Sequence, residues 1–570
     1  MTVAYDERPW LRWYPAGIPP EIDVPDVPLT RLLDDAAEQF PRRTAIAFFG
    51  RTMTYRRLVD HVDRFASALS DVGVRRGDRV ALVLPNCPQA VISFYAVLRL
   101  GAVVVQHNPL YTVPELHHQL TDSGSKVVVC YDGVYERVAE ARLGTAVRDI
   151  VVTSLADYLP WTKRRLLSLP LASAREKREK LVTELPLSAE VLDFVQMLAD
   201  APGGHRQVRV DPSQDVALLQ YTGGTTGLPK GAMLTHRALV ANAHQTGTWD
   251  YQVVKGKETT LAVLPLFHVY GLTLCLTTTV FVAGSLVLLP LFEPDLVLDA
   301  VKKYRPTIFP GVPPMYSKLL EHPRLERYDL KSIRTCVSGA MRLPPEVVDE
   351  FQKETGGNLV EGYGLTESSP VALANPLNAN ARAGTVGLPL PSTEARIVDE
   401  NADDPHRVMP VGDAGELAIR GPQMFSGYWG QPNESATMLR DGWLLTGDIC
   451  VMSPGGYFTV IDRKRDVIMA SGFSIFPSEI EDALLEHPGI AECAVVGVPD
   501  PYRGETVKAC IVTGPGQVLT AYEVEQHCAA RLTAYKVPKI VEFREDLPKN
   551  MIGKVLRRVL REEHKARARA

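Results

Sequence analysis

The sequence has few cysteines, no cysteine pair at metal-ligand spacing and no strong excess of charge of either sign. Its eight cysteines are scattered over 570 residues without a C-x-x-C pair. That pattern is typical of a reducing compartment and argues against a disulfide framework or a zinc site. The formal net charge of −5 gives no reason to expect a nucleic-acid partner. We therefore expect a cytoplasmic protein that binds no nucleic acid.

Targeting signals and membrane spans are also lacking. Residues 1–8 show no basic start followed by an apolar core, and residues 567–570 match no peroxisomal or retention signal. Residues 261–292 carry no formal charge and are numerous enough to cross a bilayer. Prolines, glycines and a threonine run interrupt this stretch, so we predict a buried helix and a buried strand rather than a membrane span.

Short aliphatic runs alternate with amphipathic stretches along most of the chain. Strands are predicted at 79–84, 102–105, 126–130 and 149–152, and helices at 55–72 and 88–99. Such alternation predicts parallel sheets covered by helices. Because 570 residues are too many for one core, the expected fold is an α/β protein of at least two domains.

Two stretches break this pattern. Residues 155–205 lose strand character and are basic at 161–167 and 175–180. A basic amphipathic stretch can lie on an anionic membrane surface, although a solvated helical insertion is the simpler interpretation. The second break is the charged run 462–466, which about one hundred residues with their own predicted strands follow. We predict a large domain (1–461), a hinge (462–466) and a small mobile domain (467–570).

The most informative run is Tyr221–Gly231, which has the sequence YTGGTTGLPKG and follows an apolar segment. Glycines let a backbone approach a ligand closely, and successive backbone N–H groups form a concavity that binds anions. The threonine hydroxyls and Lys230 add donors. The run therefore predicts a polyphosphate clamp, with an ordinary Gly-Thr turn as the alternative. It is not the kinase-type phosphate loop, because Pro229 stands where that loop has a glycine before its lysine.

Four other runs have the composition of site loops. They are LPLFH (264–268), EGYGLTES (361–368), GWLLTGD (442–448) and KNMIGKVLRR (549–558). The first sets a histidine in an apolar, proline-turned segment, and the second combines an aromatic ring with a hydroxyl and two carboxylates. Each run alone is more simply explained by core packing, a turn or a solvated lysine. Together and in this order they carry a specific resemblance.

The chain resembles the adenylate-forming superfamily of acyl-CoA synthetases, adenylation domains and beetle luciferases, and is most similar to bacterial long-chain fatty acid–CoA ligases. The likeness extends from about Leu29 to Arg561. The motifs that carry it, in family order, are 221–231, 264–268, 361–367, GELAIRG at 415–421, 442–448, the block 462–481, and 549–554.

The resemblance implies a large N-terminal α/β domain with a distorted β-barrel and a small α+β domain that rotates on the hinge. It also implies a reaction in two steps that uses ATP, Mg²⁺ and coenzyme A. A fatty acid carboxylate attacks the α-phosphate of ATP and gives an acyl-adenylate and pyrophosphate. After domain rotation a thiol attacks the adenylate.

The implied site residues are the following. The phosphates would lie on Thr222, Gly223, Gly224, Thr225, Thr226, Gly227 and Lys230. Gly339, Tyr363, Gly364, Asp448 and Arg463 would contact the rest of the nucleotide, with Tyr363 against the adenine and Asp448 on the ribose hydroxyls. Glu367, with Thr222, would bind Mg²⁺. Lys554, Glu367, Thr366 and His268 would be catalytic, and Ser471, Gly472 and Phe473 would line the path of the thiol.

Three positions depart from the family pattern. Arg465 stands at the hinge position, Asn550 replaces a threonine, and Ser474 replaces an asparagine. The last two keep a hydrogen-bonding side chain, so we expect activity to be retained.

For the substrate, residues 266–271 contain no acid that could pair with an amino group, which disfavours amino acids. Gly271, Gly311 and Gly339 and the uncharged stretch favour an apolar medium- to long-chain acyl group. An aryl acid, a carrier-protein acceptor in place of coenzyme A, and a binding protein without activity are the alternatives. A homodimer and peripheral contact of the segment 161–180 with the inner face of the membrane are further expectations.

Overall fold

The structure is a computed structural model that describes residues 5–167, 178, 181–186, 190–222, 229–400, 402, 404–470, 473–500, 503–550 and 553–569. Among these residues no helix has both the length and the apolar character that a bilayer crossing requires. The chain forms two compact units. The larger unit comprises Leu11–Glu394 and Arg420–Leu439, and the smaller unit comprises Met1–Trp10, Ala395–Ile419 and Arg440–Ala570. The hinge at 462–466 stays a prediction.

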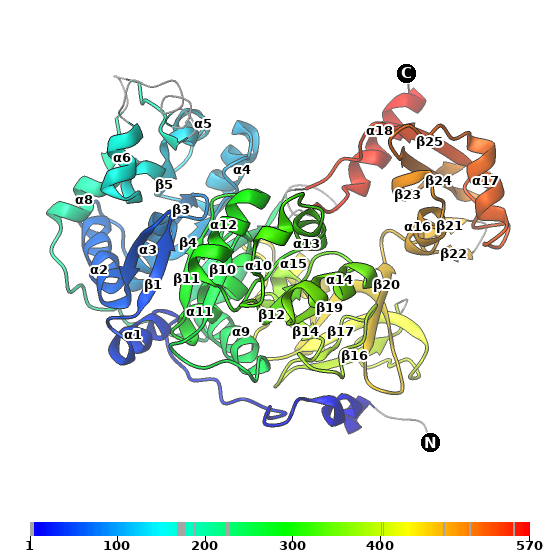
Figure 1. The fold of residues 1–570 in the computed structure, drawn as a ribbon, viewed down its shortest axis with the longest axis horizontal. Helices are drawn as coiled ribbons and strands as arrows, with labels where there is room; N and C mark the ends of the chain where they lie inside the picture. Colours follow the sequence, from blue (N-terminus) through cyan, green and yellow to red (C-terminus); the bar gives the residue numbers. More distant parts are fainter. Residues whose placement is uncertain are drawn as a thin grey trace. The chain divides into compact units, whose positions relative to one another are not determined.

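A mostly parallel, seven-stranded sheet forms one core of the larger unit (Figure 1). Its strands are β3 (Arg79–Val83), β4 (Val103–Gln106), β5 (Val127–Tyr131), β6 (Asp149–Thr153), β7 (Leu192–Asp193), β8 (Val216–Thr222) and β9 (Lys230–Thr235). Their order is β7-β6-β5-β3-β4-β8-β9, and only β8 and β9 are antiparallel. The four predicted strands are confirmed. The sequence did not indicate β7, a two-residue strand that extends the sheet beside β6.

Two four-stranded sheets complete the larger unit. The first has the order β10-β11-β1-β2, and the second β12-β13-β14-β15. Their strands are β1 (Thr44–Phe48), β2 (Arg51–Thr54), β10 (Thr259–Ala262), β11 (Ser285–Leu288), β12 (Thr335–Ser338), β13 (Asn358–Gly364), β14 (Val371–Ala374) and β15 (Leu388–Pro389). Ile308 bridges β10 to β12, so the core runs on from one sheet to the next.

Helices cover these sheets, as the alternation of the sequence predicts. They are α1 (Thr30–Gln39), α2 (Tyr55–Asp71), α3 (Pro88–Arg99), α4 (Val113–Ser123), α5 (Tyr135–Ala141), α6 (Trp161–Leu167), α8 (Phe194–Asp200), α9 (His236–Trp249), α12 (Pro294–Tyr304), α13 (Pro313–Leu320), α14 (Pro345–Thr355) and α15 (Pro432–Met438). The predicted helices at 55–72 and 88–99 are confirmed as α2 and α3. Thr54 caps α2 by accepting from the Arg57 backbone N–H, and α3 is buried on all sides. Figure 1 shows α2 between α3 and α8.

The uncharged stretch 261–292 is core, as predicted. After β10 the chain forms α10 (Val269–Gly271), a six-residue π-helical stretch η5 (Leu272–Thr277) and α11 (Thr278–Phe281), and it returns as β11. Almost all of these helical residues are buried. π-Helical turns inside helices are rare and occur frequently beside functional sites.

An open five-stranded sheet begins the smaller unit. Its strands are β16 (Glu394–Val398), β17 (Ala414–Arg420), β18 (Leu439–Arg440), β19 (Trp443–Met452) and β20 (Phe458–Arg463). The order is β16-β17-β19-β18, with β20 on β19. The strands form no closed barrel within the described residues. The N-terminal Trp10 packs on this sheet with its ring 6.2 Å from that of Phe458.

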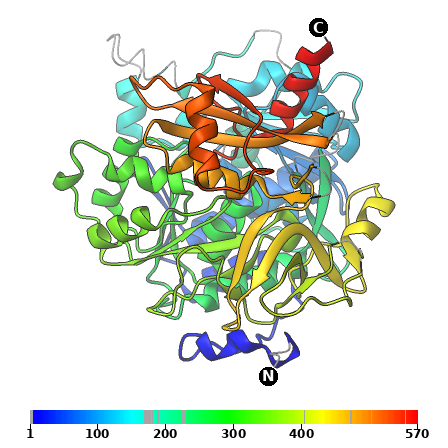
Figure 2. The same ribbon diagram turned by 90° about the vertical axis from the view of Figure 1, so that its right-hand side faces the viewer.

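A second sheet carries the helices of the smaller unit (Figure 2). Its strands are β21 (Ile468–Ala470), β22 (Phe473–Ile475), β23 (Ile490–Asp500), β24 (Gly504–Thr513) and β25 (Ile540–Arg544), and its helices are α16 (Pro477–Leu485), α17 (Ala521–Ala529) and α18 (Arg557–Arg569). Val495 faces the core under α16 and α17, whereas Ala494 and Val496 face Leu560 of α18. Alternate residues of β23 thus bury both faces.

Candidate active site

The strand ends that flank the predicted phosphate loop are well defined. Thr222 ends β8, Lys230 begins β9, and the two residues are register partners. Gly223, Gly224, Thr225, Thr226 and Gly227 lie outside the described residues. The Lys230 ammonium is 2.6 Å from a carboxylate oxygen of Glu434 and 5.6 Å from the ring centroid of Tyr428. The larger unit therefore holds the cation at the end of this hairpin between an acid and an aromatic ring.

Glu367 lies in the short helix η7 (Thr366–Ser368), which packs beside β9. Its side chain is only 7% exposed, and the Tyr428 hydroxyl donates a hydrogen bond to it. Burial and the Glu367 charge raise the pKa of Tyr428 far above its usual value. The phenol therefore stays protonated and remains a donor. Tyr428 thus links Glu367 to Lys230, and neighbouring Thr366 is partly exposed.

Close packing explains two of the predicted glycines. A Cβ at Gly364 would lie 1.7 Å from the Pro370 carbonyl oxygen, and a Cβ at Gly339 would lie 2.9 Å from the Tyr270 ring. No larger side chain fits either position. Tyr363, between these motifs in β13, is partly exposed and register partner to Leu373.

The prediction that small residues leave room for an acyl chain is wrong at three positions. The Tyr270 ring fills the space beside Gly339, and Tyr316 lies 2.8 Å from a Cβ built on Gly311. A Cβ on Gly271 would meet the Pro265 carbonyl oxygen at 2.3 Å. Glycine at these positions serves close packing, and a cavity has to be sought elsewhere.

His268 is neutral at physiological pH. Burial lowers its pKa to about 4. Its Nδ1 accepts a hydrogen bond from the Tyr270 backbone N–H at 3.2 Å, so the proton of the neutral ring is on Nε2. Gln220 of β8 donates to the Phe267 carbonyl at 3.1 Å and ties this loop to the strand that precedes the phosphate loop. His268 can donate a hydrogen bond to a ligand but is not a cation near pH 7.

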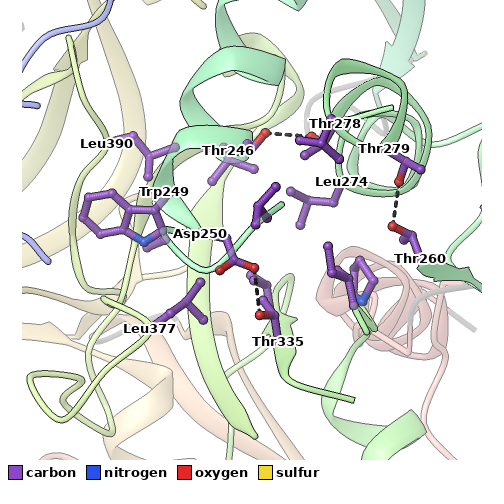
Figure 3. Close-up of a pocket in the computed structure, with 18 residues that line it drawn as sticks. Thr246, Trp249, Asp250, Thr260, Leu274, Thr278, Thr279, Thr335, Leu377 and Leu390 are labelled. Atoms are coloured by element: carbon purple, nitrogen blue, oxygen red, sulfur yellow. Dashed lines mark hydrogen bonds between the residues drawn. The ribbon is translucent and has the colours of Figure 1, made fainter. Parts of the chain in front are cut away.

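A cavity lies in the larger unit (Figure 3). Its lining includes aliphatic and aromatic side chains of α9, η5, β12, β14 and the segments that follow β14, together with five threonines and Asp250. These polar groups are paired with each other. Thr246 is 2.7 Å from Thr278, the Thr279 hydroxyl donates to Thr260, and Asp250 accepts from Thr335.

The cavity therefore presents carbon atoms to a ligand, because its hydroxyls are already bonded. Burial raises the pKa of Asp250 above its usual value, opposed by the hydrogen bonds from Thr335 and Gln252. A concave, mostly apolar lining of this kind is typical of small-molecule sites. The sequence indicated this cavity only through the uncharged stretch, which contributes Leu274 among others.

The smaller unit places Asp448 and Arg463 side by side. They are register partners on β19 and β20, and Arg463 Nε is 2.9 Å from Asp448 Oδ1. Glu416 of β17 accepts from the Gly447 backbone N–H and from Lys464 Nζ, each at 2.9 Å. These bonds hold the β19 backbone just before Asp448, so its carboxylate has a defined position.

Lys554 lies close to this pair. The Arg463 charge, followed by burial, lowers the pKa of Lys554 to about 8, and Asp448 opposes this shift. Its backbone is held in a tight turn, since Asn550 Oδ1 accepts from the Lys554 N–H at 2.8 Å and Gly553 has a φ of 81°. Asn550, a departure from the family pattern, thus bonds the backbone of the predicted catalytic lysine.

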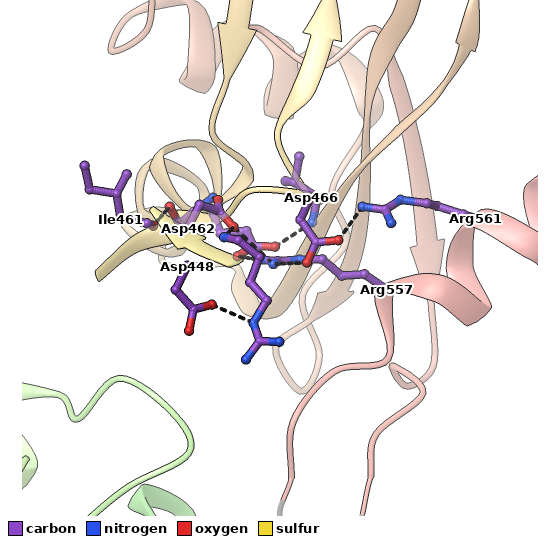
Figure 4. A network of polar contacts seen from close by, with 10 residues as sticks. Asp448, Ile461, Asp462, Asp466, Arg557 and Arg561 are labelled. Atoms are coloured by element: carbon purple, nitrogen blue, oxygen red, sulfur yellow. Dashed lines mark hydrogen bonds and ion pairs between the residues drawn. The ribbon is translucent and has the colours of Figure 1, made fainter. Parts of the chain in front are cut away.

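An ion-pair network ties the helix that follows Lys554 to the predicted hinge (Figure 4). Arg557 is 2.6 Å from Glu481, 3.3 Å from Asp466 and 3.5 Å from Asp462, and Arg561 is 2.6 Å from Asp466. Burial alone would raise the pKa of Asp466. The two arginines nevertheless hold this pKa below its usual value. The carboxylates of the charged run are therefore buried and paired.

Comparisons with known proteins identify the family to which this chain belongs. The AMP-binding enzyme family model matches residues 33–429, and the model of the AMP-binding enzyme C-terminal domain matches residues 479–554. The chain belongs to the AMP-binding enzyme family. A Bacillus subtilis long-chain-fatty-acid–CoA ligase is 43% identical over 558 residues, which cover 98% of both chains. A feruloyl-CoA synthase of an Amycolatopsis species is 35% identical and covers 91% of this chain and 96% of its own.

Solved structures of the same fold carry nucleotides. An anthranilate CoA ligase in complex with anthranoyl-AMP matches this AMP-binding enzyme with a TM-score of 0.82 at 27% identity and covers 96% of this chain and 99% of its own. The ATP-bound MatB of Rhodopseudomonas palustris matches with a TM-score of 0.80 at 29% identity, over 95% of this chain and 99% of its own. The recognition of the family from the sequence is confirmed.

The residues of this AMP-binding enzyme fit a magnesium ion that binds with its nucleotide. The described residues contain no cluster of three or more acids, histidines or cysteines that could hold a metal. Mg²⁺ is commonly held by one or two carboxylates together with substrate phosphates. The buried Glu367 beside the end of the phosphate loop matches that arrangement, and Thr222 is the hydroxyl at the other strand end.

Several predicted residues are brought together, and others lie outside what is described. Lys230 and Glu367 meet through Tyr428, and Asp448, Arg463 and Lys554 form one cluster. Ser471 and Gly472 lie outside the described residues, and Phe473 is described only as part of the backbone of β22.

The partners of predicted site residues that sequence reasoning missed are Tyr428, Glu434, Glu416 and Arg557. Glu416 and Arg557 stand inside sequence runs already recognised, so their place in those runs could have identified them. Tyr428 and Glu434 had none. Glu361 of β13 is a further candidate site residue. Burial raises its pKa to about 7, and it stands two positions before Tyr363, the predicted adenine-binding tyrosine.

Proposed function

We propose that this protein is an AMP-forming fatty acid–CoA ligase. It converts a medium- to long-chain carboxylic acid and ATP into acyl-AMP and pyrophosphate, and then transfers the acyl group to the thiol of coenzyme A. The observation that carries this proposal is the full-length likeness, at 43% identity, to a protein named long-chain-fatty-acid–CoA ligase. The predominantly carbon-lined cavity of the larger unit supports the substrate class.

The described residues supply the parts of the first step. Asp448, aligned by Arg463 and by the backbone of β19 that Glu416 anchors, would accept hydrogen bonds from the ribose hydroxyls. Lys230 would bind the outer phosphates, exchanging its surface partner Glu434 for them; such exposed ion pairs are weak, about 0–1 kcal/mol. Tyr363 would lie against the adenine, and Thr366 would contact the α-phosphate.

Lys554 would provide fixed positive charge where the carboxylate meets the α-phosphate. Glu367 would hold Mg²⁺, and the bound ion would neutralise part of the phosphate charge. We further propose that residues 467–570 rotate about 462–466 between the two steps, which would remove Lys554 before the thiol arrives.

The test of this function is an acid panel with ATP. Pyrophosphate exchange reports adenylate formation, and consumption of coenzyme A reports the complete reaction. We expect both with fatty acids and fastest turnover at medium to long chain length. Preference for aryl acids would favour the alternative suggested by the feruloyl-CoA synthase relative. Adenylate that accumulates without dependence on coenzyme A would favour a carrier-protein acceptor, and no exchange with any acid would contradict an enzyme.

Adenylate formation should fall as the pH rises through about 8. Lys554 has a pKa of about 8 and provides its positive charge only while protonated. The alkaline limb of pyrophosphate exchange should therefore lie near that value. Because Arg463 is the largest cause of the lowered pKa, Arg463→Gln should move the limb to higher pH. A limb that stays in place in this variant would contradict the assignment to Lys554.

Filling the cavity should change the preferred chain length. We expect Leu274→Phe to raise KM for a long-chain acid at least about tenfold, since a single methylene in an apolar pocket is worth about 1–3 kcal/mol. KM for a short acid should change little. The ratio of the KM for the long-chain acid to the KM for the short acid separates pocket filling from general overpacking. Both values should be measured on one preparation whose thermal stability has been checked. An unchanged ratio would place the acyl chain elsewhere.

Peripheral contact with a membrane is proposed for the segment around α6. Trp161 is 69% exposed, and Lys163, Arg164 and Arg165 follow it in the same short helix. An exposed tryptophan beside several cations is a composition suited to a lipid–water interface. Cytoplasmic location is proposed with it. A homodimer stays a prediction, which sedimentation velocity of the purified chain would test.

A further inference from the structure

A second, much smaller cavity lies in the larger unit apart from the residues assigned to the reaction. It opens between the edge strand β2, the first turn of α2, the start of α3 and the turn η4 (Leu155–Tyr158). Its walls are apolar, from Ile46, Phe48, Met53 and Pro88, and they are buried. Two arginines, Arg51 and Arg57, complete the lining together with Thr52 and Tyr158.

Neither arginine has a carboxylate at ion-pair distance in the described part of the chain. Arg51 donates to the Asp157 backbone carbonyl at 3.0 Å and lies 5.1 Å from the Tyr158 ring. Arg57 reaches only the ring of His61, at 3.3 Å. Burial, followed by the charge of Arg57, lowers the pKa of Arg51. Two cations that repel one another are stabilised by an anion between them.

His61 stands beside this cavity as a neutral ring and adds no charge to it. Its Nδ1 is 3.0 Å from the Tyr158 hydroxyl, and burial, together with Arg57, lowers its pKa to about 4. Further cations lie beside the same strand end. Lys163 of α6 is 5.8 Å from the ring of Phe49, and Lys303 Nζ would be 2.8 Å from a Cβ on Gly50. Lys163, in the exposed basic segment that begins at Trp161, therefore lies beside the turn between β1 and β2.

We infer that Arg51 and Arg57 form a binding site for the anionic head of an acyl lipid. The planar guanidinium matches the geometry of a carboxylate or a phosphate, and apolar side chains stand beside the two arginines. Two sources share this chemistry: the phosphate head of a membrane lipid and the carboxylate head of a free fatty acid. The site rests on the proposed membrane contact, to which it adds a specific lipid-head pocket.

The experiment is cosedimentation of the full-length protein with three kinds of vesicle. These contain phosphatidylcholine alone, phosphatidylcholine with phosphatidylglycerol, and phosphatidylcholine with oleic acid. The test variant is Arg51→Gln with Arg57→Gln. Since each arginine at an anionic surface contributes a factor of roughly five, the double variant should bind anionic vesicles about 25-fold more weakly. Arg57→Gln alone, at an exposed helix position, should weaken binding about fivefold and serves if the double variant folds poorly.

The matched control removes two arginines that already have acid partners. Arg305 is 3.1 Å from Asp329, and Arg324 is 2.7 Å from Asp295. The Arg305→Gln, Arg324→Gln variant has the same change in net charge. Because the partnered charges are on the surface and screened by salt, its binding should weaken less than about threefold.

Weaker binding of the test variant with near wild-type binding of the control supports the pocket. Loss confined to one kind of anionic vesicle also supports it and identifies the head as phosphate or carboxylate. Equal binding by wild type and test variant overturns the pocket, as does equal loss in test and control. Wild-type protein that binds no anionic vesicle but still forms acyl-CoA overturns both the membrane contact and the pocket, and leaves the proposed reaction standing.

Discussion

Replacing Lys554 with alanine should lower the rate of acyl-adenylate formation by about two to three orders of magnitude, the effect typical of losing one preorganised charge at a reacting centre. The second step should change little, because the proposed rotation removes Lys554 before the thiol attacks. Pyrophosphate exchange measures the first step. Conversion of synthetic acyl-adenylate with coenzyme A measures the second step separately.

Lys549→Ala is the control for this substitution. Lys549 stands in the same segment, five residues earlier, and its ammonium forms an ion pair with Glu492 within the smaller unit. It should leave both half-reactions within a few-fold of wild type. An equal loss of both half-reactions in Lys554→Ala would contradict the division of labour between the two steps, even if the overall reaction stopped.

The strands and several site pairs could be predicted because their signals are local. β3, β5 and β6 are short β-branched runs bounded by polar residues, and both faces of such strands are buried in a parallel sheet. The resemblance assigned both Asp448 and Arg463, which stand in two different motifs, to nucleotide binding. The structure gives the reason, since β19 and β20 are antiparallel neighbours that bring these two residues into register.

What could not be predicted depends on contacts between residues far apart in the sequence. Glu434 pairs with Lys230 across 204 positions, and Tyr428 reaches Glu367 across 61. No spacing rule links such pairs, because the chain between them folds through other elements first. Arg51 and Arg57 are likewise unremarkable in sequence, since only the fold shows that neither has an acid partner among the described residues.

The glycines show how a correct motif can carry a wrong physical reason. Gly311 and Gly339 resemble positions that leave space for a ligand. In the folded chain Tyr316 and Tyr270 occupy that space. A sequence states that a side chain is missing but not what fills its place. The carbon-lined cavity is built instead by residues from α9, η5, β12 and β14, whose convergence is a property of packing.

Replacing Arg557 with methionine should loosen the helix that follows Lys554. The substitution leaves Asp462, Asp466 and Glu481 buried with fewer partners, and removing one member of a buried ion pair costs about 3–5 kcal/mol. Arg561 remains on Asp466, so the lower end of that range is expected. Amide hydrogen exchange of α16 and α18 in the full chain should accelerate about 100-fold, the equivalent of roughly 3 kcal/mol.

Arg558→Met is the control, because Arg558 is the next residue of the same helix and its partner Glu562 is exposed on the surface. It should change the rate of amide exchange less than about fivefold, as expected for a surface pair.

The pH profile of adenylate formation separates an effect of Arg557 on the Lys554 ammonium from a loss of stability alone. Arg557 is one of the charges that lower the pKa of Lys554, so its loss should also move the alkaline limb of adenylate formation upward. Arg557→Lys keeps the charge but not the planar fork, and should keep the limb in place while restoring only part of the protection. A limb that does not move in Arg557→Met would show that the network stabilises α18 without tuning the lysine.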